Sequence, residues 1–154
     1  MTGGPHVSLN RLADLARAAG RSGEAEGLYR RSLQVREELT ELVPGNTTYR
    51  RDVSVSYERL AELVRLEYPD QAQSFAARAV AMRRAAHNLD PQREDIAVEL
   101  SYSLFLSGVI IESVEGAASN IGRAEILATL SPFESRDLLG DRGRALLRWA
   151  RERE

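Results

Sequence analysis

The sequence predicts an all-α protein, an α-solenoid of about seven helices in which three helical hairpins precede a C-terminal capping helix. Three observations predict this fold class. Aromatic residues make up only 6% of the chain and alanine is abundant, which favours helix over sheet. Apolar residues recur three or four positions apart, the spacing of one helix face. Whole segments also recur after 47 or 48 residues, which is typical of a repeat array.

The repeat is clearest in the first two thirds of the chain. Residues 8–15 match residues 56–63 in type at nearly every position, 48 residues apart. Five further residue pairs lie 47 positions apart: Ala25 and Ala72, Leu28 and Phe75, Leu33 and Val80, Arg36 and Arg83, and Pro44 and Pro91. A weaker third start follows, where Ser101-Tyr102 resembles Ser56-Tyr57. The single domain 1–154 therefore divides into repeat one (7–52), repeat two (53–90), a degenerate third repeat (91–130) and a capping helix (132–152).

The first hairpin begins with an apolar stripe formed by Leu9, Leu12, Ala13 and Ala16. We expect Gly20 to end this first helix, because glycine is the usual residue just past a helix C-terminus. Ser22 can cap the second helix, which continues over residues 24–43. Pro44-Gly45-Asn46 then breaks the chain.

The second hairpin follows the same plan. Its first helix carries the apolar residues Val55, Leu60, Leu63 and Val64, and a turn follows at Tyr68-Pro69-Asp70. The second helix carries apolar and small residues at helical spacing, namely Ala72, Phe75, Ala76, Ala79 and Val80. We expect Asp90-Pro91 to open the third unit, with a capping residue followed by proline at the first helical position.

The third unit is less regular. Residues 100–111 are apolar on several sides, and Val109-Ile110-Ile111 alone could form a strand; length and the repeat context favour a buried helix. Residues 119–130 are expected to form its partner helix. Ser131-Pro132-Phe133-Glu134 has the form of a capping box, so we expect the last helix to begin there. Such a closing helix covers the apolar face that the final repeat would otherwise expose.

Charge and composition exclude several functions. The formal net charge is −2, so nothing draws the chain as a whole toward nucleic acid or an anionic membrane. The apolar run 104–111 is interrupted by Ser107 and Gly108 and is too short to span a bilayer, and the N-terminus lacks the apolar core of a secretory signal. We expect a soluble, cytoplasmic protein that binds neither nucleic acid nor membranes.

Catalytic and metal chemistry also lack candidate residues. The chain has no cysteine, and His6 and His87 lie far apart with no further ligands at metal spacing. Gly140 and Gly143 cannot form a phosphate loop, because no strand precedes them and no lysine follows. The acids are spaced as in helix-surface salt bridges. We therefore predict no enzyme, no catalytic residue, no metal, no cofactor and no small-molecule substrate.

All 21 basic residues are arginines, and three doublets stand out: Arg30-Arg31, Arg50-Arg51 and Arg83-Arg84. Nearby acids and the absence of interleaved aromatic residues favour a solvated helix face with local ion pairs over a nucleic-acid surface. Tyr102 and Trp149 are expected to be core or capping residues, with a ligand platform as the alternative.

Five residues of the first hairpin resemble the tetratricopeptide consensus. Leu12-Ala13 supplies the large and small pair of the first helix, and Ala25, Tyr29 and Ser32 supply the small, aromatic and small residues of the second. The 47 to 48 residue period is longer than the usual unit and is similar to the extended variant in kinesin light chains and in actinobacterial signalling proteins. The resemblance covers residues 7–90 well and 91–130 loosely. It implies a scaffold that binds a protein or peptide partner.

In that family the first helix of each hairpin lines a concave groove. The resemblance therefore implies a partner-binding groove here, formed by Asn10, Asp14, Arg17, Glu58, Glu62, Arg65, Ser103 and Ser107. The alternative is that these residues form a solvated helix face that only keeps the protein soluble. Some relatives grip a peptide carboxylate with basic groups at such positions, but Asp14, Glu58 and Glu62 would repel a carboxylate. These acids favour a partner with basic character.

Two further hypotheses remain open from the sequence. The exposed face of the first hairpin, formed by Val7, Leu9, Leu15 and Leu28, could pair with a second copy to give a homodimer. The chain could also be a piece of a longer array in a multidomain signalling protein, since no polar N-terminal cap covers the first unit.

Overall fold

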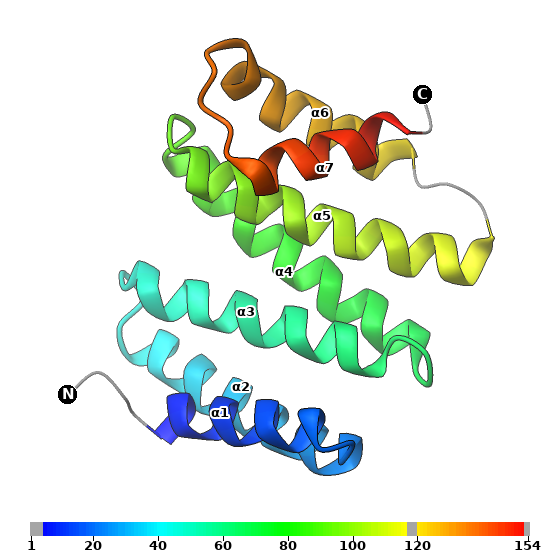
Figure 1. Cartoon of the computed structure of the whole chain (residues 1–154). Helices are drawn as coiled ribbons and strands as arrows, with labels where there is room; N and C mark the ends of the chain where they lie inside the picture. Colours follow the sequence, from blue (N-terminus) through cyan, green and yellow to red (C-terminus); the bar gives the residue numbers. More distant parts are fainter. Residues whose placement is uncertain (1–4, 117–119, 153–154) are drawn as a thin grey trace. The chain divides into compact units, whose positions relative to one another are not determined.

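The computed structural model describes residues 5–116 and 120–152, and the side chains of residues 9–116 and 122–152. The described residues form seven α-helices and no β-strand, which confirms the all-α class (Figure 1). The helices are α1 (Pro5–Ala18), α2 (Ser22–Leu42), α3 (Thr47–Val64), α4 (Pro69–Leu89), α5 (Glu94–Glu115), α6 (Asn120–Ser135) and α7 (Asp141–Arg151).

The chain forms two compact units, residues 1–75 and 76–154, with the division inside α4. In the first unit α1 packs on α2, and α2 packs on α3. In the second unit α6 packs on α5, and α7 packs on both. Each unit is described by itself below.

Helix positions follow the repeat period of the sequence. α2 and α4 begin 47 residues apart, at Ser22 and Pro69, and α3 and α5 also begin 47 residues apart, at Thr47 and Glu94. The predicted repeat boundaries do not coincide with the helices, because residue 52 lies inside α3. The hairpins span 5–42, 47–89 and 94–135.

The turns of the first unit are close to those predicted. Gly20 adopts a φ of +79°, a left-handed conformation that glycine accepts without strain, and it follows α1 directly as expected. Asn46 caps α3, since its side chain accepts a hydrogen bond from the Tyr49 backbone N–H at 3.0 Å. The prediction that Ser22 caps α2 is wrong: Ser22 is the first helical residue, and Arg21 occupies the cap position without a side-chain bond.

The helix over residues 100–111 is confirmed, but its start is not where we predicted. Asp90 ends α4, with its backbone N–H donating to Ala86 and His87 carbonyls at 3.2 Å. A further turn closes from the Arg93 N–H to the Asp90 carbonyl at 3.3 Å, and only then does α5 begin, at Glu94. Asp90-Pro91 therefore belongs to the connection and does not cap the third unit.

α5 is the most apolar helix of the described chain. An 18-residue window within its 22 residues has a mean hydropathy of 1.4, so by length and composition it passes the test for a membrane span that the shorter run 104–111 failed. Half of that window is buried inside the structure, as in the central helix of a packed core.

The predicted start of the last helix is also wrong. Residues 131–134 lie at the end of α6, Pro132 stands inside that helix, and α7 begins only at Asp141. Proline costs a helix one hydrogen bond, but here the turn it occupies carries Phe133, which is 1% exposed. Burial of this ring beside Leu130 stabilises the helix past the proline.

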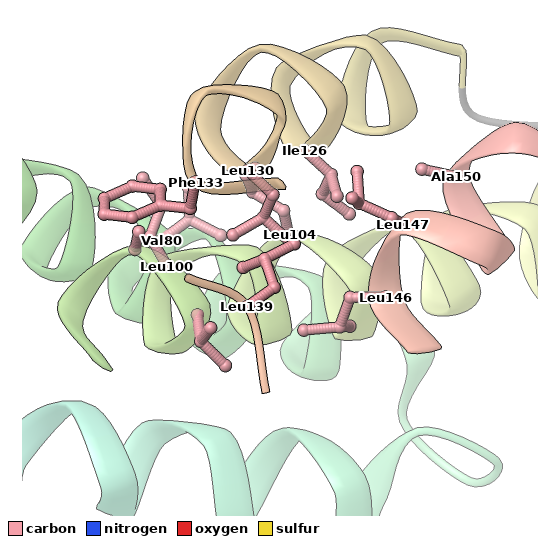
Figure 2. Packing of buried hydrophobic residues seen from close by; sticks show 12 residues of the cluster. Val80, Leu100, Leu104, Ile126, Leu130, Phe133, Leu139, Leu146, Leu147 and Ala150 are labelled. Carbon is pink, nitrogen blue, oxygen red and sulfur yellow. The ribbon is translucent and has the colours of Figure 1, made fainter. Parts of the chain in front are cut away.

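The core of the second unit is a continuous hydrocarbon cluster. Figure 2 shows Ile126, Leu130 and Phe133 projecting from α6 toward Leu100 and Leu104, with Leu147 of α7 alongside. Gly143 permits close packing of α7, since a β-carbon there would lie 2.8 Å from the Leu139 side chain and 3.3 Å from Val98. Its role in the fold is therefore close approach.

Candidate partner-binding surface

Two ion pairs join the first helices of successive hairpins within the first unit. Arg59 of α3 lies 3.3 Å from the Asp14 carboxylate of α1, and Arg17 of α1 lies 3.6 Å from the Glu62 carboxylate of α3. The four side chains are between 27% and 45% exposed, so they are accessible from solvent. We call this set, Asp14, Arg17, Arg59 and Glu62, the α1–α3 strip. The charges alternate in sign both along and across the two helices.

A buried tyrosine of α2 supports the strip from below. Tyr29 is completely buried, and its hydroxyl donates a hydrogen bond to the carboxylate of Asp14. Burial, followed by this bond to a carboxylate, raises the pKa of Tyr29 to about 12. Asp14 therefore has a donor on its inner side and Arg59 on its outer side, which restricts the conformations of its carboxylate.

Beneath the strip lies a buried polar layer centred on Arg36 of α2, which is 6% exposed. Its guanidinium donates to the Asp52 backbone carbonyl at 2.9 Å and to the Ser56 hydroxyl at 2.7 Å. With the Asn10 amide oriented so that its oxygen faces Arg36, that oxygen accepts from Arg36 at 3.1 Å and the amide nitrogen donates to Ser32 at 3.0 Å. We call Asn10, Ser32, Arg36 and Ser56 the Arg36 layer. Burial lowers the pKa of Arg36.

The predicted groove residues are not equivalent in the structure. Asp14, Arg17 and Glu62 come together in the strip, and Arg65 is exposed at the end of α3. Three others are buried, because Asn10 is 8% exposed, Glu58 is 6% exposed and Ser103 is not exposed at all. Ser107 is partly buried, and it lies with Ser103 on α5 of the second unit.

Two residues of this surface were missing from the sequence-based set. Arg59 pairs with Asp14, and Tyr29 fixes Asp14 from below. The repeat could have indicated Arg59, because Arg11 and Arg59 lie 48 residues apart like the other matched pairs. Tyr29 was assigned to packing, and nothing in its spacing shows that its hydroxyl reaches a carboxylate on another helix.

The arginine doublets follow the predicted surface pairing only in part. Arg30 pairs with Glu26 on its own helix at 2.9 Å, as expected of a solvated face. Arg84 instead pairs with Glu125 of α6 at 2.7 Å, and Arg83 is 6% exposed and pairs with Glu99 of α5 at 2.7 Å. Arg83 is thus a buried residue, in keeping with its position 47 residues after Arg36.

An aromatic cluster lies beside the core of the second unit. The Phe105 and Trp149 rings meet edge to face with centroids 4.8 Å apart, and Tyr102 lies 6.2 Å from Phe105. Arg123 stacks on Trp149 at 3.7 Å and bonds to Glu112 at 3.0 Å. These rings pack against the hydrocarbon cluster, which supports the interpretation of Tyr102 and Trp149 as core residues.

Metal ligands do not gather among the described residues, where no group of three or more histidines, cysteines and acids could hold an ion. The His87 ring is partly buried with an unpartnered Nδ1, while the side chain of His6 lies outside the described residues.

Comparison with protein-family models, curated protein sequences and solved structures finds no match to this chain.

Proposed function

We propose that this chain is a non-catalytic helical-repeat module that binds a segment of a partner protein along the α1–α3 strip. Support comes from the tetratricopeptide-like residues of the first hairpin and from the 47-residue spacing of successive helices. On this proposal the protein is a cytoplasmic scaffold of the α-solenoid type, with no cofactor and no substrate of its own.

The observation that carries the proposal is the fixed geometry of the strip. Exposed ion pairs contribute little to folding stability, typically about 0–1 kcal/mol, because water screens them and the side chains lose entropy. Asp14 is nevertheless held by a fully buried tyrosine and faces an arginine on another helix. A surface whose charges are already oriented loses less entropy on binding, and such preorganisation favours recognition.

The pairing also narrows the chemistry of the partner. Asp14 and Glu62 each face an arginine, so the strip presents alternating charges and not a negative surface. We therefore modify the preference for a purely basic partner. A segment with basic and acidic side chains three or four residues apart would match the alternation, and an amphipathic helix has that spacing.

Self-association is the second candidate function, and one observation favours it. Leu12 is 53% exposed and Leu15 is 65% exposed on α1, so the first hairpin carries uncovered apolar surface. Leu9 and Leu28 are partly buried, and the side chain of Val7 lies outside the described residues.

Peptide selection against the full chain tests the proposal. Peptides selected from a random display library would be titrated against the chain and against Arg17→Ala and Glu62→Ala variants. The matched control is the exposed pair Arg21 and Glu24, 3.4 Å apart on one helix, changed to alanine in the same way. We expect the strip variants to weaken binding several-fold and the control variants to leave it unchanged. Equal binding by strip and control variants would contradict the proposal.

A further inference from the structure

One side of α3 faces the preceding hairpin, and its residues can be traced along the helix. The Asp52 carbonyl and the Ser56 hydroxyl receive Arg36 of α2, and Arg59 reaches Asp14 of α1. Positions 52, 56 and 59 are four and three residues apart, so they form one stripe of the helix. Leu60 and Leu63 continue this stripe, four and seven residues after Ser56. Leu60 is completely buried.

α1 carries the same stripe 48 residues earlier. Ser8, Arg11, Leu12 and Leu15 correspond in order to Ser56, Arg59, Leu60 and Leu63. The surroundings differ, because Leu12 is 53% exposed where Leu60 is buried, and Leu15 is 65% exposed. Arg11 is exposed as well. We call Arg11, Leu12 and Leu15 the α1 outer face.

We propose that the α1 outer face binds an amphipathic helix of a partner protein, whose aliphatic residues cover Leu12 and Leu15 and whose carboxylate pairs with Arg11. The chain contains its own template for this contact. Arg59, the counterpart of Arg11, pairs with an acid on the helix that precedes it. Arg11 is the only charged residue of the outer face, so an acidic residue on the partner is the complement.

This site differs from the α1–α3 strip and does not depend on it. Asp14 and Arg17 of the strip point from α1 toward α3, as their ion pairs show. The outer face lies on another side of α1, extended by the exposed Ala18 and Ala19. These small residues allow a partner helix to approach closely.

A second copy of the chain fits this face less well than an acidic helix. Antiparallel pairing of two α1 helices, centred between Leu12 and Leu15, would place each leucine against the other. Arg11 would then lie opposite Ala16 of the other copy, with no acid in reach. The two leucines also provide far less than the roughly 800 Å² per partner that a stable interface buries. Charge and area therefore favour a partner that contributes its own acids.

Fluorescence anisotropy with two synthetic helical peptides tests this proposal. Both peptides carry a leucine and alanine stripe; one has glutamates beside the stripe and the other has lysines at the same positions. The full chain is compared with Leu15→Arg and Arg11→Glu. The matched controls are Leu66→Arg, a leucine 81% exposed near the end of α3, and Arg148→Glu, an exposed arginine of α7. Circular dichroism melts establish that every variant remains folded.

We expect the glutamate peptide to bind the full chain in a saturable manner. Leu15→Arg should weaken binding at least tenfold, since a buried leucine is worth about 1.5–3 kcal/mol and 1.4 kcal/mol is tenfold. Arg11→Glu should reverse the preference toward the lysine peptide, and the two controls should bind like the unmodified chain. A reversed preference would not follow from mere loss of structure.

Three results would overturn the proposal. The first is no saturable binding of the glutamate peptide, and the second is equal loss in the outer-face and control variants. The third comes from sedimentation velocity of the chain alone: a stable dimer that Leu15→Arg dissolves would show that a second copy covers this face. A change in the strip, such as Glu62→Ala, should leave peptide binding intact, so failure of either proposal can be told from failure of the other.

Discussion

The interiors of the two units are built from different chemistry. In the second unit the space between α5, α6 and α7 is filled by large aliphatic residues and Phe133. In the first unit, alanines and Tyr29 pack around the Arg36 layer, and four polar side chains of α1, α2 and α3 lie in the interior. Meanwhile two leucines of α1 remain exposed.

This difference indicates how stability and binding are distributed. A hydrocarbon core gains free energy in proportion to the apolar area removed from water, at about 25 cal/mol per Å². A buried hydrogen bond has a net contribution of only about 0.5–1.5 kcal/mol, yet leaving its partner unmade is costly. We therefore expect the second unit to supply most of the stability. The first unit supplies precise geometry and an apolar outer face.

The largest expected effect is truncation of the hydrocarbon core. Phe133→Ala should lower the free energy of unfolding by about 3–5 kcal/mol, since it removes a ring that is 1% exposed and leaves a cavity. Leu138→Ala, at a leucine that is 52% exposed nearby, should cost less than about 0.5 kcal/mol. Urea unfolding followed by circular dichroism measures both. Similar losses for the two variants would contradict the assignment of the core.

A smaller loss is expected from the polar interior, and it should depend on what replaces the arginine. Arg36→Ala should cost about 1–3 kcal/mol, because it leaves a cavity and removes the donor to the Asp52 carbonyl and Ser56. Arg36→Met keeps much of the volume without burying a charge, and it should cost less than Arg36→Ala. The exposed Arg31→Ala serves as the control. If Arg36→Ala unfolds like Arg31→Ala, the Arg36 layer does not stabilise the first unit.

A dependence on alkaline pH should distinguish Tyr29 from its phenylalanine variant. The folded protein holds the Tyr29 proton up to a pKa of about 12, against an ordinary value of 10.0. The raised pKa means that this contribution to stability is complete below pH 10 and is lost as the pH rises from 10 to 12. Tyr29→Phe should therefore lose less stability over that window than the unmodified chain. Urea titrations at pH 8, 10 and 11 measure the difference, and parallel curves would contradict it.

The smallest effect is expected on the surface of the strip. A double-mutant cycle with Arg17→Ala and Glu62→Ala should give a coupling energy below about 1 kcal/mol, since the atoms are 3.6 Å apart and both side chains are accessible. The coupling should shrink further in high salt. A coupling above about 2 kcal/mol would mean that this pair serves stability and not recognition.

The sequence was sufficient for the helices and insufficient for the contacts between them. Periodicity and the 47-residue recurrence predicted each helical region, including residues 100–111, where a strand was the alternative. Helix boundaries failed where local motifs competed with packing. Ser131-Pro132 has the form of a helix start, but burial of Phe133 extends α6 through it. Asp90-Pro91 similarly closes α4 and does not open α5.

The candidate surface was predicted only in outline for the same reason. Helical spacing places Asn10, Asp14 and Arg17 on one side of α1, but spacing cannot show that Asn10 turns inward to Ser32 and Arg36 while Asp14 remains accessible. Which member of a polar stripe is buried depends on the neighbouring helix. The burial of Arg36 could not be inferred from its charge, although its recurrence as Arg83 marked both positions as unusual.

The most direct test of this division of roles is hydrogen–deuterium exchange of the full chain, with and without the glutamate peptide. In the free chain, we expect the amides of α1 to exchange faster than those of α5 and α6, because α1 carries uncovered leucines and the others surround the hydrocarbon core. With the peptide bound, α1 should gain protection while α5, α6 and α7 remain unchanged. Equal exchange of α1 and α5 in the free chain, or protection gained only in the second unit, would contradict the assignment of binding to the first unit and stability to the second.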